Sequence, residues 1–285
     1  MFALAANKPA EFARLALQFP ERNANPLYSD WGAAYYAATY PEADDLSFAS
    51  DDSFVRCNPH NGTVSYFGMP IAPIGNYHDN LGGILCGRSI LINTKWASSD
   101  TRIDTSWATC DLSLSEAQLH KHIRKSYTSL INAGRRDLRV VYYNGQTCEH
   151  WMLSLYRDFH ARVAGRITRS EASWAATRDM IVNDHAELVL GYRDDLLVAG
   201  LIIFYGTERA YYASAVNLRS QFDKPLGHFL LWDAILRSRA RGLRWFDLGE
   251  LPEHGTALKK EYNIGHFKAG FATQIESRSA WLTCT

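Results

Sequence analysis

The segment Lys224-Pro225-Leu226-Gly227-His228 follows a strand and a polar loop, and it places a proline and a glycine at the start of an expected helix. The backbone N–H groups in the first turn of a helix have no partners within the helix, and the helix dipole is positive at that end. Such a junction suits a pyrophosphate or another anion, which makes Lys224, Gly227 and His228 candidate binding residues. An ordinary strand-to-helix connection has the same pattern.

Two further groups of basic residues have the chemistry to hold anions. Arg166 and Arg169 lie in a loop between two expected helices, and arginine can hold a carboxylate or phosphate in a forked geometry. Solvation, or pairing with a neighbouring side chain, is the alternative for each. The most basic stretch of the chain supplies candidate RNA or anion contacts at Lys121, Arg124, Lys125, Arg135 and Arg136. A solvated helix face explains that stretch equally well.

Several common types of site have no signature in this chain. There is no phosphate-binding P-loop, no G-x-G-x-x-G after a strand, no H-E-x-x-H, no G-x-S-x-G and no kinase signature set. His120 and His122 are two residues apart on an expected helix, so they face different directions and cannot share a metal. The five cysteines are scattered without a C-x-x-C pair, which predicts reduced thiols in a cytosolic protein. We expect no metal site.

Composition is that of an ordinary globular protein. The chain has 285 residues, of which 47% are apolar and 21% charged, values that exclude general disorder. Lys plus Arg and Asp plus Glu each number 30, so net charge predicts no partner, and extensive contact with DNA is not expected. No apolar run approaches the roughly 18 residues of a spanning helix, and the N-terminus lacks a basic segment typical of a signal peptide. We therefore expect a cytoplasmic protein without a transmembrane segment.

The elements expected after the first 105 residues alternate between helices and strands. A capping box at Ser113 and Glu116 predicts a helix that Gly134 ends. Spacing of apolar residues and turn signals predicts the remaining elements. They are helices at Thr147–Ala164, Ser170–Asn183, Pro225–Arg241 and Leu258–Asn263, and strands at Leu138–Tyr143, Ala186–Tyr192, Leu196–Tyr205, Arg209–Val216, Arg244–Leu248 and Thr273–Leu282. This order predicts an α+β fold with mixed strand pairing, preceded by an irregular region of short strands and loops.

From about Asp111 to Phe271 the chain resembles the FemAB-like, or BioF2-like, branch of the GNAT acyltransferase superfamily. The residues that carry the resemblance are Asp111-Leu112-Ser113, Arg124-Lys125-Ser126, Phe159-His160, Gly165-Arg166, Tyr211-Tyr212, Ala213-Ser214-Ala215, Lys224-Pro225-Leu226, Arg241-Gly242, Phe246-Asp247-Leu248-Gly249 and Phe267-Lys268-x-x-Phe271. The resemblance implies a GNAT-like fold in two halves, with a degenerate N-terminal subdomain at residues 1–110 and an acyltransferase domain at 111–285. The glycine pair of the usual GNAT pyrophosphate loop is missing from residues 219–225, which departs from the superfamily pattern.

The resemblance also implies a set of site residues. Lys268 of the Phe-Lys motif would stabilise negative charge on a carbonyl oxygen, with Phe267 beside it. Asp247 and Glu250 flank the end of a strand, where open sheets place ligands, and either would orient an amine or relay its proton. Side chains alternate along the strand that carries Tyr211, Tyr212 and Ser214, so only one of the two tyrosines is expected to reach substrate.

The activity implied is transfer of an acyl or aminoacyl group to a primary amine of a small molecule or saccharide precursor. The donor is acyl-CoA or aminoacyl-tRNA as a co-substrate, with no permanently bound cofactor. The basic stretch from Lys121 to Arg139 favours tRNA, while the balanced net charge argues against extensive RNA contact. The alternative is a catalytically silent GNAT-like module that binds RNA or a protein partner.

Overall fold

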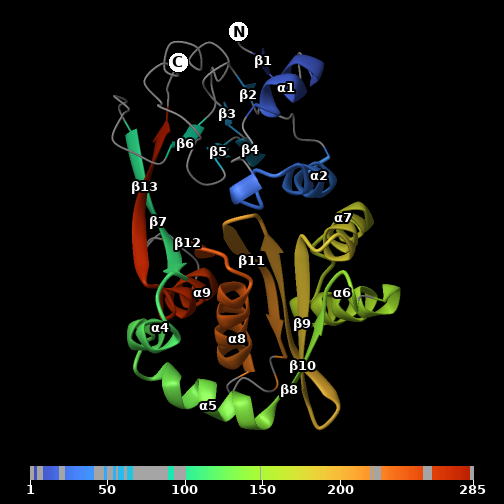
Figure 1. Ribbon diagram of the computed structural model, residues 1–285, viewed down its shortest axis with the longest axis vertical. Coiled ribbons are helices and arrows are strands. Elements are labelled where there is room, and N and C mark those ends of the chain that lie inside the picture. The colour runs from blue at the N-terminus through green and yellow to red at the C-terminus, as the bar shows by residue number, and fades with distance from the viewer. Residues whose placement is uncertain are drawn as a thin grey trace.

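A computed structural model describes the chain over most of its C-terminal part and over shorter pieces of its N-terminal part (Figure 1). The described residues are 3–4, 9–18, 23–41, 48–49, 54–55, 57–60, 63–66, 89–92, 101–147, 149–218, 220, 226–252 and 259–282. Lys224, and with it most of the loop that leads into the helix after Asn217, lies outside them.

A large mixed sheet runs through the molecule in the order β4-β5-β6-β13-β7-β12-β11-β10-β9-β8. Its strands are β4 (Cys57–His60), β5 (Thr63–Tyr66), β6 (Ser89–Ile92), β7 (Thr101–Asp111), β8 (Arg139–Tyr143), β9 (Ala186–Arg193), β10 (Leu196–Tyr205), β11 (Arg209–Asn217), β12 (Trp245–Leu251) and β13 (Gln274–Leu282). Among these neighbours, β5 with β6 and β11 with β12 are parallel. A small antiparallel sheet contains β1 (Ala3–Leu4), β2 (Phe48–Ala49) and β3 (Phe54–Val55).

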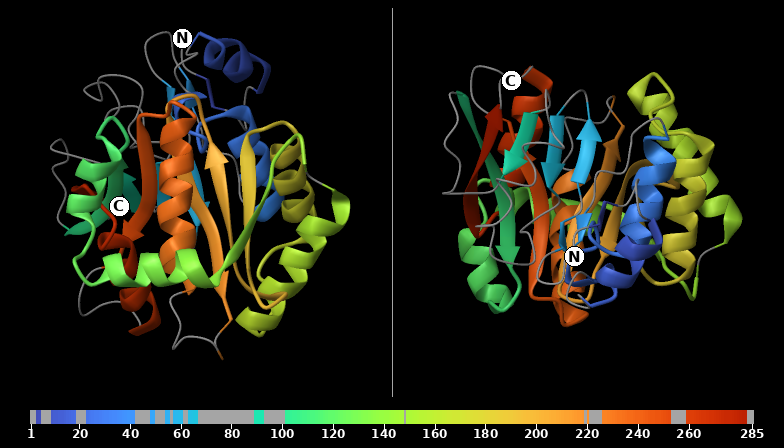
Figure 2. Two further views of the ribbon diagram at one scale, coloured as in Figure 1. Left: turned by 60° about the horizontal axis from the view of Figure 1, so that its bottom comes forward. Right: turned by 90° about the horizontal axis from the view of Figure 1, so that it is seen from above.

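Helices cover both faces of the sheet around β8 to β12. They are α1 (Pro9–Ala16), α2 (Asp30–Thr39), α4 (Glu116–His122), α5 (Tyr127–Asp137), α6 (His150–Ala164), α7 (Glu171–Val182), α8 (Leu226–Ala240) and α9 (Lys259–Ala269). Figure 2 shows α8 in front of the strands with α5 crossing below it. One core cluster joins residues of α4, α5 and α8 to the sheet, and the other joins residues of α1, α2, α6 and α7 to it. No helix in the described part of the chain combines the length and apolar character needed to cross a bilayer.

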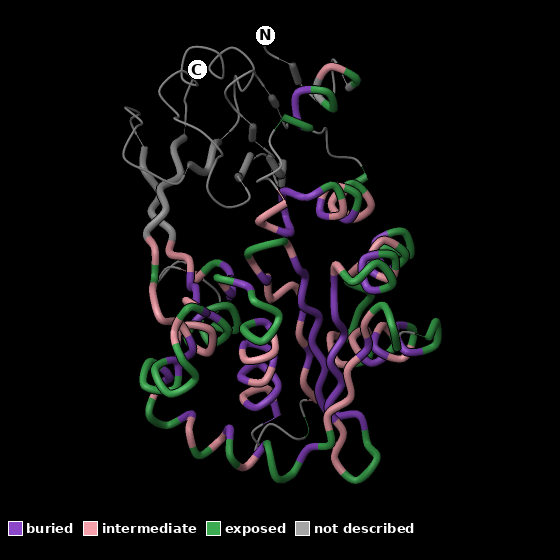
Figure 3. Tube along the Cα trace, viewed as in Figure 1, coloured by how far each residue is buried: buried purple, intermediate pink, exposed green. Residues whose placement is uncertain are grey.

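The expected meander is confirmed in β9, β10 and β11. Every residue of β10 after Leu196 is buried (Figure 3). The continuous apolar run in the sequence therefore corresponds to a strand that is covered on both faces. Asp194 and Asp195, which make the β9–β10 turn, have φ angles of 47° and 62°. Aspartate tolerates this left-handed conformation better than most residues, which is why the pair marks the turn in the sequence.

Three sequence expectations about helices are wrong. The capping box is formed by Ser115 and Gln118, two residues after the expected pair at Ser113 and Glu116. The helix expected to run to Gly134 is two helices, α4 and α5, because the backbone at Ile123 is extended. The last helix does not end at Asn263: α9 runs on to Ala269, since Gly265 is buried against Pro252 within the helix and is not a helix end.

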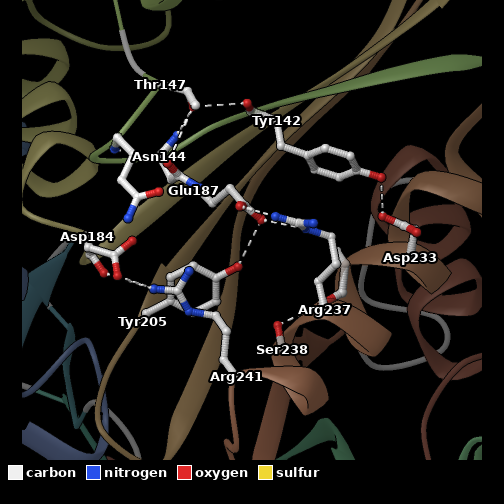
Figure 4. Close-up of polar contacts among 12 residues, drawn as sticks. Tyr142, Asn144, Thr147, Asp184, Glu187, Tyr205, Asp233, Arg237, Ser238 and Arg241 are labelled. Atoms are coloured by element: carbon white, nitrogen blue, oxygen red, sulfur yellow. Dashed lines mark hydrogen bonds and ion pairs between the residues drawn. The ribbon is translucent and has the colours of Figure 1, made fainter.

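A network of charged and phenolic side chains fixes the C-terminal half of α8 to β8, β9 and β10 (Figure 4). The Glu187 carboxylate is fully buried and accepts from Arg237 Nη2 at 2.5 Å, from Arg237 Nε at 3.1 Å and from the Tyr205 hydroxyl at 3.2 Å. Tyr142 donates to Asp233 at 2.5 Å, and Arg241 donates to Asp184 at 2.6 Å. We call these residues the α8 network; its charged side chains are all bonded.

Candidate active site

The parallel strands β11 and β12 separate soon after they meet. Their register joins Arg209 to Trp245, Ala210 to Phe246 and Tyr211 to Asp247, and it extends no further. At this point β11 skips Ala213 in its pairing with β10, and β12 skips Leu248 in its pairing with β7. Such bulges redirect a strand. Beyond the bulges the facing edges of the two strands carry backbone groups that do not pair with each other, and a ligand inserted there could bond to both.

Lys268 lies beside this separation, in the last turn of α9. A Cβ atom at Gly249 would lie 3.1 Å from Lys268 Nζ and 3.7 Å from a ring carbon of Tyr211, so the glycine leaves room for the amine. Gly249 also has a φ of 92°, which favours glycine. Burial lowers the pKa of Lys268 to about 8, opposed by the Glu250 carboxylate. Among the residues that the structure describes, none forms a hydrogen bond or ion pair with Nζ.

The two candidate carboxylates have different surroundings. Asp247 is only 4% exposed, and its Oδ1 accepts from Arg209 at 2.9 Å and from Thr109 at 3.2 Å. Glu250 is exposed on the last part of β12. Asp247 is therefore held as one partner of a buried ion pair, whereas Glu250 is open to solvent next to Lys268.

Arg169 is a second cation, bonded to a side chain of β11 and to one of α2. Its Nε donates to the Tyr35 hydroxyl at 2.9 Å, its Nη1 donates to Ser214 Oγ at 3.3 Å, and its guanidinium lies 5.3 Å from the centre of the Trp174 ring. Tyr156 shares Ser214 Oγ at 3.0 Å. No described carboxylate forms an ion pair with Arg169. Trp174 is buried.

Phenol rings from the N-terminal part of the chain surround this guanidinium. Burial raises the pKa of Tyr211, and nearby Tyr35 raises it further. Tyr36 and Tyr40 stack with ring centres 6.1 Å apart, and the charge of Arg169 lowers the pKa of both against the larger effect of burial. Sequence reasoning placed no site residue before position 121 and missed these side chains. The only signal is the density of tyrosine at positions 35, 36 and 40.

Contacts with α7 and with the β10–β11 turn place α2 at the site. Ser170 donates to the backbone oxygen of Ala38 at 2.9 Å, and the hydroxyls of Thr39 and Ser173 are 2.9 Å apart. The backbone N–H of Thr207 donates to Asn23 at 2.8 Å. Helix α2 therefore supplies part of the wall around Arg169.

The remaining predicted residues lie around these two cations or away from them. Tyr211 packs toward the α2 side of the sheet and Tyr212 toward the α8 side. Only Tyr211 of the two therefore lies on the same side of the sheet as Tyr35. Gly227 packs against Asn217, and the rings of His228 and Phe267 meet edge to face in an aromatic cluster at the start of α8. Arg166 is exposed and forms no ion pair with a described residue. Lys121 of α4, Lys125 of the α4–α5 turn, and Arg135 and Arg136 of α5 are exposed. Arg124 is not on that outward face: it bonds to Tyr127 and His266.

His160 lies close to positive charge. Burial, with smaller contributions from the charges of Arg169 and Lys260, lowers the pKa of His160 to about 4. His160 is therefore neutral near pH 7 and adds no positive charge beside Arg169. A negatively charged group would be favoured here.

Comparison with known proteins gives matches at the level of structure. No protein-family model and no curated protein sequence matches the chain. FemX matches with a TM-score of 0.62 at 10% identity, over 93% of this chain and 95% of FemX. L-PGS from Bacillus licheniformis matches at 0.60 and 10% identity, over 94% and 90% of the two chains. A tandem GNAT protein from the clavulanic acid biosynthesis pathway matches at 0.50 and 13% identity, over 98% and 97%.

These identities are too low to carry function, but the matches span nearly the whole chain. The expected α+β class with a two-part GNAT-like architecture is confirmed, while the boundary at residue 110 stays a prediction. The chain has the fold that FemX, L-PGS and the tandem GNAT protein share.

Proposed function

We propose that the protein is an acyltransferase that moves an acyl or aminoacyl group from an activated donor to a primary amine. The observation that carries the proposal is the Lys268 amine, which bonds to none of the described residues and lies where β11 and β12 separate. A donor lying along the two unpaired strand edges would bring its carbonyl oxygen to this cation. Cations placed where negative charge develops are among the strongest contributors to acyl transfer.

The reaction needs one cation and one proton acceptor. The acceptor nitrogen attacks the carbonyl carbon, a C–N bond forms, and the oxygen gains charge that the Lys268 ammonium stabilises. The bond to the donor's sulfur or ribose oxygen then breaks, and that leaving group takes a proton. Glu250 is the exposed carboxylate placed to receive the proton that the amine loses, directly or through water. Its charge also favours the protonated form of Lys268.

Arg169 would bind an acidic part of the donor or acceptor. Its guanidinium is oriented by Tyr35, Ser214 and Trp174, and no described carboxylate neutralises it. Neutral phenol hydroxyls around it supply further donors. Arg166, exposed three residues away, would contact the same group from the rim. Lys224, Gly227 and His228 are proposed contacts for the donor's anionic part at the start of α8.

Two donors fit the proposal: an acyl-CoA, and an aminoacyl-tRNA whose backbone the exposed Lys121, Lys125, Arg135 and Arg136 would contact. The acceptor is a small-molecule or saccharide-precursor amine in the cytoplasm.

The test is turnover by the purified protein with acetyl-CoA, longer acyl-CoAs and aminoacyl-tRNA against a panel of primary amines. Lys268→Met should lower kcat about a hundredfold or more. Lys260→Met, which changes an exposed lysine of the same helix, should leave kcat within about twofold. If no donor is consumed, the acyltransferase proposal fails, and stabilisation by RNA alone would favour the silent binding module.

A further inference from the structure

We infer that Arg124 is a positioning residue for Lys268, acting through both sides of the turn that carries the amine. This inference rests on the proposed function for its catalytic consequence. Its structural part concerns only the environment of the lysine and can be tested without substrate.

Arg124 bonds to the chain two residues before Lys268 and two residues after it. Its backbone N–H donates to the Gly270 oxygen at 2.8 Å. Its guanidinium Nη1 lies 2.9 Å from His266 Nδ1, and because a guanidinium only donates, the histidine nitrogen accepts. A residue in the α4–α5 turn thus holds the end of α9 at two points.

Tyr127 completes this support. Arg124 Nη1 donates to the Tyr127 hydroxyl at 2.7 Å, and that hydroxyl donates to the backbone oxygen of His266 at 3.5 Å. The Tyr127 ring lies directly against Gly270, where a Cβ would overlap it. Replacing that glycine would therefore displace either the ring or the Lys268 turn.

Aromatic packing fixes the residues on either side of the lysine in the same cluster. Ring centres of Tyr127 and Phe271 are 5.1 Å apart, and those of His228 and Phe267 are 5.1 Å apart. Burial, with a smaller contribution from the charge of Arg124, lowers the pKa of His228 to about 4, so the ring is neutral near pH 7. The start of α8, the end of α9 and the α4–α5 turn therefore meet around one arginine.

Lys125, the residue after Arg124, is a surface residue and serves as the comparison. Lys125 follows Arg124 directly, is exposed, and has no bond to a described residue. Both residues lie in the basic stretch that the sequence offers as an RNA or anion contact. Arg124 Nη1 and the Arg124 backbone N–H are engaged at the end of α9, so loss of this side chain should act on Lys268.

The experiment compares Arg124→Gln with Lys125→Gln in the full chain. Trace labelling with acetic anhydride across a pH series, followed by peptide mass spectrometry, reports the titration of Lys268 without any substrate. In the unaltered protein the charged and phenolic groups facing the amine are Glu250 of β12 and Tyr211 of β11. Arg124→Gln should raise the labelling midpoint of Lys268 by about half a unit or more, because the loosened turn admits water. Lys125→Gln should not move it.

Turnover supplies the second readout. Arg124→Gln should lower kcat by about tenfold to a hundredfold with KM for the donor nearly unchanged, as expected for a misplaced group. An unchanged titration in folded Arg124→Gln, or a raised KM with unchanged kcat, would overturn the inference. Tyr127→Phe removes one hydroxyl and should shift the titration in the same direction by less, which covers the case in which Arg124→Gln fails to fold. If the protein transfers no acyl group, the proposed function fails while the titration still tests the positioning.

Discussion

The α8 network and the candidate active site differ in whether their buried charged side chains are bonded to described side chains of opposite charge. Under the C-terminal half of α8, the buried Glu187 carboxylate is bonded to Arg237 and to the Tyr205 hydroxyl (Figure 4). Where β11 and β12 separate, the Lys268 amine has no bond to a described residue, and Arg169 has only neutral partners.

Whether a buried charge is bonded to an opposite charge indicates whether it serves the fold or a functional site. A buried charge with a bonded partner is compatible with a stable fold, although it contributes little net stability over apolar residues. A half-buried cation without a bonded acid lowers stability, and perturbed groups of this kind gather at functional sites. The comparison therefore assigns structure to the α8 network and ligand binding to Lys268 and Arg169.

The largest expected effect is on stability, in the α8 network. Glu187→Ala leaves Arg237 without its carboxylate next to apolar surroundings, which should lower the free energy of unfolding by about 3–5 kcal/mol. Urea unfolding followed by circular dichroism measures it. Glu171→Ala, which removes an exposed ion pair with Arg157, should cost under about 1 kcal/mol. Equal losses in the two variants would show that the α8 network is not special.

A smaller effect, on substrate binding, is expected at Arg169. Arg169→Met keeps a long side chain over Trp174 but removes the charge, so KM for an acidic substrate should rise about tenfold to a hundredfold. Steady-state kinetics with the natural acidic substrate and a neutral amide analogue provide the measurement. The neutral analogue should be nearly insensitive to the change, and equal effects on both substrates would remove the anion-binding role.

The smallest expected effect is a shift in pH dependence. If the charged form of Lys268 is required, kcat should be full below pH 8 and fall as pH rises through about 8. Glu250 raises the pKa of Lys268, so Glu250→Gln should lower the midpoint by about half a unit, besides slowing turnover. Glu261→Gln, an exposed change on α9, serves as the control. A rate that rises through pH 8 would make Lys268 a base and not a cation.

Local signals predicted most of the fold. Apolar runs and turn signals located β9, β10 and β11, and the spacing of apolar residues located α7 within Ser170–Asn183. The errors occurred where tertiary contacts decide where a helix begins or ends. A glycine such as Gly265 often marks the end of a helix. Here its lack of a side chain lets α9 pack against Pro252, and the helix continues through Lys268 to Ala269.

The site was predictable only in its C-terminal half. The Phe-Lys motif pointed to Lys268, and the loop arginines pointed to Arg169. Tyr35, which accepts from Arg169, is 134 residues away in the sequence, and nothing local marks it as a partner. Ring stacking of Trp107 on Tyr211 is equally non-local, since it depends on how β7 and β12 pair. Contacts between distant elements are set by topology and not by spacing.

The most direct test measures stability and turnover of Lys268→Met in one preparation. Because burial lowers the pKa of Lys268 from an ordinary value near 10.5 to about 8, folding at pH 7 penalises its charged form. The variant should therefore be more stable at pH 7 by on the order of 2 kcal/mol, and this gain should disappear as the pH rises toward 10. It should also lose acyl transfer by about a hundredfold or more. A variant that is less stable than the parent, or equally active, would contradict the account.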